Sequence, residues 1–139
     1  LHWMVHSFPT RRSSDLFVGD TIFNHCQTWL YTSNMKQWFQ SLDRLLDLDV
    51  DFIVPGHGEV CNKREIYMQR AFLLEWITAV ATAIAKGWSK EECVDRISFL
   101  DRFPCDIGQE YKGPEVTKNN VIALYDLLTA KMPPITEKR

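Results

Sequence analysis

The sequence predicts an α+β fold, in which a strand–helix–strand unit is followed by a wholly helical half. Two short apolar runs end in tight loops, one at Gly19-Asp20 and the other at Pro55-Gly56-His57-Gly58. The segment between these loops has the periodicity of an amphipathic helix, and the residues after Val60 carry helical signals only. A chain of 139 residues, 45% hydrophobic and 24% charged, is long enough for one such domain with a real core.

The strand–helix–strand unit is expected to begin with β-prone residues on both sides of Gly19-Asp20. This pattern predicts either two strands or one bent strand with Asp20 at the turn. Residues 24–33 have no clean period and predict a loop. Asn34, with Gln37 three residues later, is typical of a helix start, and residues 52–55 form the next strand.

Three helices are expected after residue 60. Two capping pairs open the first two of them, Asn62 with Glu65 and Ser89 with Glu92. Gly87 suits the end of the first and longest helix. Residues 100–113 form an irregular connection, and Pro114 suits the first turn of the last helix.

Residues 1–16 are interpreted as an artefactual segment, foreign to the fold. Residues 6–16 read HSFPTRRSSDL and resemble one reading frame of a sequencing adapter over the whole run. The natural polypeptide is then expected to start near Phe17, and the origin of residues 1–5 is unknown. A polar N-terminal extension is the alternative. Artefactual segments are left out of fold reasoning.

Composition narrows the classes of partner. The formal net charge of −2 offers no electrostatic footprint for nucleic acid or for an anionic membrane. No apolar stretch is long enough to span a bilayer. The four cysteines show no CxxC spacing and no disulfide framework, which favours a cytoplasmic location. A small-molecule substrate is therefore the expected partner, and the oligomeric state is left open.

The two strand ends offer a pair of candidate metal ligands, Asp20 and His57. Carboxylate oxygen and imidazole nitrogen suit zinc, iron or manganese. The glycines beside them allow close approach of the backbone and positive φ values. A catalytic zinc usually has three protein ligands, however. From the residues alone, a turn histidine and a capping aspartate explain the pattern equally well.

A resemblance adds information to this pair. Phe17-Val18-Gly19-Asp20-Thr21, the amphipathic helix and Asp51-Phe52-Ile53-Val54-Pro55-Gly56-His57-Gly58 together resemble the C-terminal half of a metallo-β-lactamase-fold hydrolase. The match covers residues 17–60, and residues 61–139 are similar to the helical C-terminal extension of some members. The resemblance implies half of an αββα sandwich. It also implies that Asp20 bridges two divalent metal ions and that His57 binds the second.

The chain departs from the family's pattern in one respect. The family's His-x-His-x-Asp-His loop, the ligating histidine that follows it and the N-terminal sheet have no counterpart here. The chain is therefore expected to be a C-terminal fragment, inactive by itself and without bound metal. His25 is the only other histidine after residue 16 and matches no family ligand, so it is considered as a substrate contact. Glu59 is expected to be a solvated loop acid, with a role as a partner of His57 as the alternative.

For the intact parent, the resemblance implies a metal-dependent hydrolase of a small thioester, ester, lactone or lactam. Its nucleophile would be a metal-bound hydroxide, with zinc the favoured metal and iron or manganese the alternatives. An iron-dependent oxidoreductase of the same fold is a second hypothesis. A non-catalytic helical interaction module, in which Asp20 and His57 are structural, is a third.

Two further expectations follow from the resemblance. The irregular connection carries a polar cluster that either contributes to substrate choice or is a solvated loop held by ion pairs: Arg102, Asp106, Glu110 and Tyr111. If half of the sandwich is missing, one face or edge of the sheet is uncovered, and residues 52–54 should be unusually exposed.

Overall fold

The computed structural model describes residues 15–130, and its elements follow the predicted order. Within that range an α+β fold with one two-stranded sheet is confirmed. The elements are β1 (Asp15–Phe23), α1 (Met35–Asp47), β2 (Phe52–His57), α2 (Lys63–Ala85), α3 (Lys90–Arg96), the short 3₁₀ helix η1 (Glu110–Lys112) and α4 (Gly113–Thr129).

The two strands run parallel, and α1 makes the crossover between them. β1 is the single bent strand that the sequence allowed, with register shifts on both sides of Gly19, whose φ is 51°. Of the segment interpreted as artefactual, residues 1–14 lie outside the described residues. The last two, Asp15 and Leu16, begin β1 and pair with Phe52 and Ile53.

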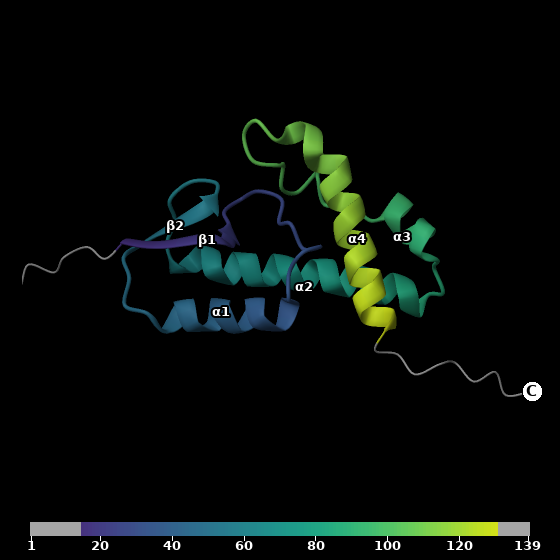
Figure 1. The fold of residues 1–139 in the computed structure, drawn as a ribbon, viewed down its shortest axis with the longest axis horizontal. Helices are drawn as coiled ribbons and strands as arrows, with labels where there is room; N and C mark the ends of the chain where they lie inside the picture. Colours follow the sequence, from purple (N-terminus) through teal and green to yellow (C-terminus); the bar gives the residue numbers. More distant parts are fainter. Residues whose placement is uncertain (1–14, 131–139) are drawn as a thin grey trace, which may run out of the picture.

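The helices cover one side of the sheet. Figure 1 shows α1 and the N-terminal part of α2 side by side beneath the strands. The Asn34 side chain caps α1 by accepting the N–H of Gln37, as predicted. Trp38 and Leu42 of α1 then reach the core, while the opposite face of the helix meets solvent.

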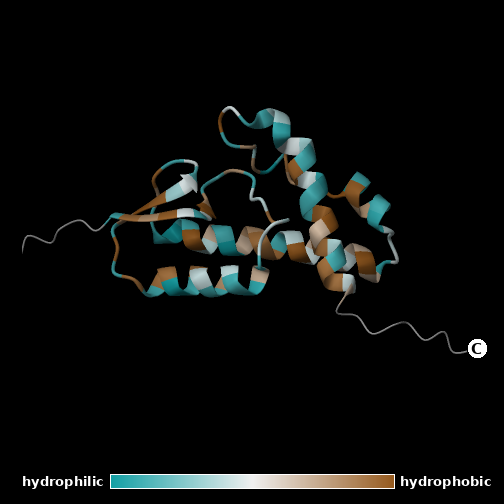
Figure 2. Cartoon of the chain, viewed as in Figure 1, coloured by the Kyte–Doolittle hydropathy of each residue, from teal (hydrophilic) through white to brown (hydrophobic). Residues whose placement is uncertain are grey.

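The helical half is built on α2. Figure 1 shows α4 crossing the C-terminal part of α2, with α3 beyond it. Figure 2 shows that hydrophobic segments concentrate on the strands and where these helices meet. The Ser89–Glu92 capping box is confirmed, and Asn62 caps α2 through the Arg64 N–H. No helix within residues 15–130 combines the length and apolar character needed to cross a bilayer.

The expected exposure of residues 52–54 is only partly confirmed. Phe52 is 50% exposed, and Phe17 on the same face of β1 is 78% exposed. The prediction is wrong for Ile53, which is 0% exposed. Successive side chains of a strand point to opposite faces, so Ile53 enters the core beneath the sheet while Phe52 and Phe17 face solvent.

Candidate metal centre

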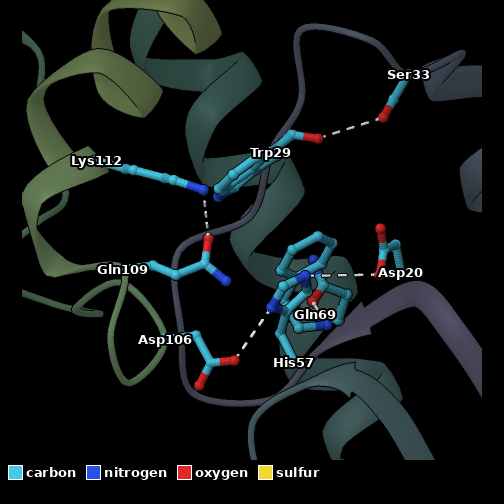
Figure 3. A network of polar contacts seen from close by, with 9 residues as sticks. Asp20, Trp29, Ser33, His57, Gln69, Asp106, Gln109 and Lys112 are labelled. Atoms are coloured by element: carbon cyan, nitrogen blue, oxygen red, sulfur yellow. Dashed lines mark hydrogen bonds and ion pairs between the residues drawn. The ribbon is translucent and has the colours of Figure 1, made fainter.

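The pairing of the two strands brings together Asp20, which lies within β1, and His57, the last residue of β2, as the sequence predicted for this pair. The His57 Nε2 atom lies 3.6 Å from Asp20 Oδ1. The imidazole is largely buried, with 21% of its side chain exposed, whereas the aspartate side chain is 76% exposed. Figure 3 shows His57 at the centre of a polar network, with Asp20 on one side and Asp106 on the other.

Glycines make this approach of the two strand ends possible. A Cβ atom on Gly56 would lie 2.3 Å from Asp20 Oδ1 and 2.7 Å from the Gly19 carbonyl carbon. Gly58 has a φ of 85°, and a Cβ atom there would lie 2.1 Å from the Asn24 carbonyl oxygen. Neither position accepts a side chain without displacing its neighbour.

Backbone hydrogen bonds then tie the His57 loop to the end of β1. The Asn24 N–H donates to the His57 carbonyl oxygen at 2.9 Å. The Asn24 side chain donates from Nδ2 to the Glu59 carbonyl oxygen, also at 2.9 Å. The loop that presents the imidazole is therefore held by the residue that follows the strand presenting Asp20.

Aromatic rings orient the imidazole. The Phe23 ring stacks on it, with centroids 4.8 Å apart and planes 7° from parallel. The Trp29 indole lies further away at 6.3 Å and is inclined by 21°. Phe23 is itself the last residue of β1, so the strand that carries Asp20 also carries the platform for His57. This stacking limits rotation of the ring out of its plane.

The second nitrogen of the imidazole meets a carboxylate from the C-terminal half. His57 Nδ1 lies 3.1 Å from Asp106 Oδ2. The other oxygen, Oδ1, accepts the backbone N–H of Ile107 at 2.9 Å. The sequence placed Asp106 in a polar cluster expected to be a solvated loop, with substrate choice as the alternative, and offered Glu59 as a possible partner of His57. Instead Asp106 occupies that place, and the Glu59 side chain is exposed.

A buried glutamine anchors the connection that carries Asp106. Gln27 is 1% exposed, and its N–H donates to the Pro104 carbonyl oxygen at 2.8 Å. Its side-chain Nε2 donates to the carbonyl oxygen of Phe99 at 2.7 Å and also to that of Phe103. These hydrogen bonds fix the irregular connection, just before Asp106, to the loop after β1.

Two more buried amides hold the loop after β1 in place. Gln69 of α2 accepts the Phe23 N–H at 2.9 Å and donates to the Thr28 hydroxyl at 3.0 Å. Asn120 of α4 accepts the Leu30 N–H and donates to the Thr28 carbonyl oxygen, each at 2.7 Å. A loop without any regular period is therefore held by side chains from two helices. Buried backbone groups need such partners.

The distance between the Asp20 and His57 donor atoms can be compared with the spacing of two ligands on a tetrahedral metal ion. Two ligands at about 2.1 Å from a tetrahedral metal lie about 3.4 Å apart. The separation of 3.6 Å between Asp20 Oδ1 and His57 Nε2 fits two such positions. Within residues 15–130 no group of three His, Cys, Asp or Glu side chains could hold a metal ion. Among residues 15–130, Asp20 and His57 are therefore a candidate donor pair, fewer than the three protein ligands usual for a catalytic zinc.

His25, considered above as a substrate contact, is exposed and contacts a glutamate of α2. Its Nε2 lies 3.2 Å from Glu65 Oε2, and its side chain is 62% exposed. Its φ of 55° makes it the non-glycine residue with a left-handed backbone among those described. Glu65 was predicted to complete the capping box of α2, but its carboxylate contacts His25 instead. His25 thus meets α2 and takes no part in the contacts of His57.

The cysteines are buried thiols that are hard to ionise. All four are buried and free. Burial raises the pKa of the Cys26 thiol to about 12, with Asp106 and Cys105 as lesser causes. The pKa values of Cys61, Cys93 and Cys105 are also raised, mainly by burial. Because the thiolate is the ligand, a metal would have to displace a proton from each of these buried thiols.

A lysine borders the network on the side of the C-terminal helices. Lys112 Nζ lies 5.0 Å from the centroid of the Trp29 indole and donates to Gln109 Oε1 at 3.2 Å. Figure 3 shows this lysine and Gln109 beside Asp106. The residues around His57 thus include a cation above an aromatic face, in addition to the two carboxylates.

The family comparison agrees with this geometry. A family model described as the metallo-beta-lactamase superfamily matches residues 5–57. The matched range contains both strand ends and stops at His57, which confirms the resemblance seen in the sequence over that range. It begins upstream of Phe17, inside the segment interpreted as artefactual. A search of the curated proteins finds no match.

Proposed function

We propose that this chain is the C-terminal part of a metal-dependent hydrolase of the metallo-β-lactamase fold. The observation that carries the proposal is the approach of Asp20 Oδ1 to His57 Nε2 at 3.6 Å, inside the range matched by the family model. In the parent enzyme the two-stranded sheet is one part of an αββα sandwich. The N-terminal half supplies the remaining ligands and covers the face that carries Phe17 and Phe52.

Asp20 and His57 would hold the metal ions, which we propose to be two divalent cations, zinc before iron or manganese. When bound, such ions supply Lewis acidity and lower the pKa of a water molecule. The Asp20 side chain is exposed, so its carboxylate would be open to bound metal ions. His57 is held by Phe23 and Asp106, which suits a ligand of fixed direction.

The substrate is proposed to be a small thioester, ester, lactone or lactam. Trp29 and Lys112 offer an aromatic face and a cation beside the centre, so a substrate with an apolar part and an anionic group would suit this side. His25 stays a proposed substrate contact. We propose a cytoplasmic location, supported by four free, buried cysteines.

Metal content tests the proposal in the longer parent chain. The upstream genomic sequence should encode a His-x-His-x-Asp-His loop in frame with Phe17. Metal bound by the purified parent is then measured by elemental analysis, with and without His57→Ala. We expect the substitution to remove at least one equivalent, because it deletes a ligand of the second metal.

His25→Ala is the matched control, since it removes the other histidine of residues 15–130 without touching His57. It should leave the metal content unchanged. If His57→Ala also leaves the metal content unchanged, the site assignment is wrong and the structural explanation of Asp20 and His57 is correct. Bound iron in the purified parent, together with an absence of hydrolytic activity, would favour the oxidoreductase hypothesis.

A further inference from the structure

We propose that Asp106 is a positioning residue that holds His57 in the tautomer whose Nε2 lone pair faces Asp20. The tautomer follows from contacts within the chain, whereas its purpose in metal binding rests on the proposed function. The inference assigns part of the metal centre to the C-terminal helical half, which lies outside the range matched by the family model.

The first step concerns the direction of the Asp106 carboxylate. Oδ1 accepts the N–H of the next residue, Ile107, at 2.9 Å. That bond turns Oδ2 toward His57 Nδ1, 3.1 Å away. The Asp106 carbonyl oxygen accepts the Gln109 N–H at 2.9 Å, so the backbone at this point is held as well. The carboxylate is therefore oriented by its own turn and does not depend on the imidazole.

The second step concerns the imidazole. An ionised carboxylate only accepts hydrogen bonds, so its partner nitrogen must carry a proton. In the neutral ring this leaves Nε2 with a lone pair, because only one nitrogen is protonated. The side chain of Asp106 is 28% exposed and that of His57 is 21% exposed, so water competes only partly for this bond. Phe23 stacks on the ring and opposes its rotation.

The third step concerns the space between His57 and Asp20. With Nδ1 protonated, Nε2 presents a lone pair to a carboxylate oxygen 3.6 Å away. Two acceptors that face each other at this separation repel, and a cation between them relieves that repulsion. The cation is either a proton on Nε2 or a metal ion. Asp106 thus prepares a cation site by excluding the neutral tautomer in which Nε2–H would satisfy Asp20 directly.

Nitrogen NMR tests the tautomer in the 139-residue chain without metal. The ¹⁵N shifts of an imidazole distinguish its two neutral tautomers from the imidazolium ion. At a pH where the ring is neutral, we expect the wild-type His57 ring to carry its proton on Nδ1. Asp106→Ala should shift the population toward the Nε2–H form, and Asp106→Glu should restore part of the Nδ1–H form.

Asp101→Ala is the matched control, because Asp101 is an exposed acid on the same connection. It should leave the His57 shifts unchanged. Far-UV circular dichroism verifies that each variant is folded, and Asp106→Asn provides a variant of the same shape should Asp106→Ala unfold. A wild-type ring protonated on Nε2, or His57 shifts unaffected by Asp106→Ala and by Asp106→Asn, would overturn the proposal.

Zinc titration of the longer parent chain, which carries the remaining proposed ligands, separates this inference from the proposed function. We expect zinc to perturb His57 Nε2 in the wild type, with an apparent affinity about 10–100-fold weaker in Asp106→Ala. Equal affinity in the two chains would overturn the positioning role toward metal. No perturbation of His57 in the wild type at any zinc concentration would contradict the proposed site, while the tautomer result would stand.

Discussion

Gly56 and Gly58, the neighbours of His57, let its loop lie close to the chain at Asp20 and Asn24. Gly56 approaches Asp20 from one side of the loop, and Gly58 approaches the Asn24 carbonyl oxygen from the other. Gly58 also has a φ of 85°, which a residue with a side chain adopts only under strain. The positions of Asp20 and His57, the proposed metal ligands, therefore depend on two residues that have no side chain.

Gly58→Ala is expected to destabilise the fold by more than the cost of the backbone conformation alone. A left-handed φ costs a non-glycine residue roughly 1–3 kcal/mol. The new Cβ atom would also lie 2.1 Å from the Asn24 carbonyl oxygen, which must move. The free energy of unfolding, measured with urea, should fall accordingly.

Gly108→Ala isolates the contribution of that contact. Gly108 has a φ of 81°, close to that of Gly58, but nothing lies within 4 Å of its would-be Cβ atom. It should therefore show only the conformational cost. Equal losses in the two variants would mean that the contact with Asn24 costs nothing.

The pairing of Asp20 with His57 could be predicted from the sequence, whereas the contact with Asp106 could not. Residues at the ends of adjacent parallel strands lie close together by topology alone. Asp106 lies 49 residues from His57 along the chain, in a segment without periodicity. The sequence shows that residue 106 is acidic. The orientation of its carboxylate, however, depends on the hydrogen bond from Ile107 and on the hydrogen bonds by which Gln27 holds the segment.

Among the elements, helices were the best predicted. Their starts carry local signals that act within a few residues, such as the side chains of Asn34 and Ser89. The capping box expected at Asn62 and Glu65 failed because a distant group, His25, competes for the Glu65 carboxylate. Residues 24–33 were correctly predicted to be an irregular loop. The side-chain amides that hold the loop, Gln69 and Asn120, lie on α2 and α4, so the loop's own sequence does not reveal them.

Asn120→Ala is expected to show how strongly α4 holds that loop. The substitution leaves the Leu30 N–H and the Thr28 carbonyl oxygen buried without partners. Each such group costs about 1–3 kcal/mol, so a loss of about 2–6 kcal/mol in the free energy of unfolding is expected. Chemical denaturation measures it.

The adjacent asparagine provides the comparison. Asn119→Ala removes a half-buried side chain of the same type from the same helix. It should change the free energy of unfolding by no more than about 0.5 kcal/mol. If both variants lose the same amount, the two hydrogen bonds of Asn120 are not what stabilises the loop.

At the scale of the whole molecule, the buried thiols are expected to lower the free energy of unfolding as the pH rises into the alkaline range. Burial raises the pKa of Cys26 from 9.0 to about 12, and the other cysteines shift in the same direction. The folded state therefore keeps protons that the unfolded state releases above about pH 9. The stabilising contribution is fully present below pH 9 and is lost as the pH rises toward about 12.

Thermal unfolding at a series of pH values measures this loss. The wild type should become less stable between about pH 9 and pH 12. Cys26→Ala should show a shallower decline, because the group with the largest shift is removed. Tyrosines and lysines titrate in the same range, and the comparison between the two chains cancels their contribution. Parallel declines would mean that Cys26 ionises equally easily in both states.

The hydrogen bonds between Gln27 and residues 99–104 limit how segments of this chain can be exchanged with those of relatives. Three amides link the loop after β1 to the second half of the chain: Gln27, Gln69 and Asn120. A chimera joined at residue 60 would separate each amide from at least one of its partners, and it would separate His57 from Asp106. The helical half is therefore not an interchangeable module: a graft that keeps the centre intact must carry residues 24–33 with the helices.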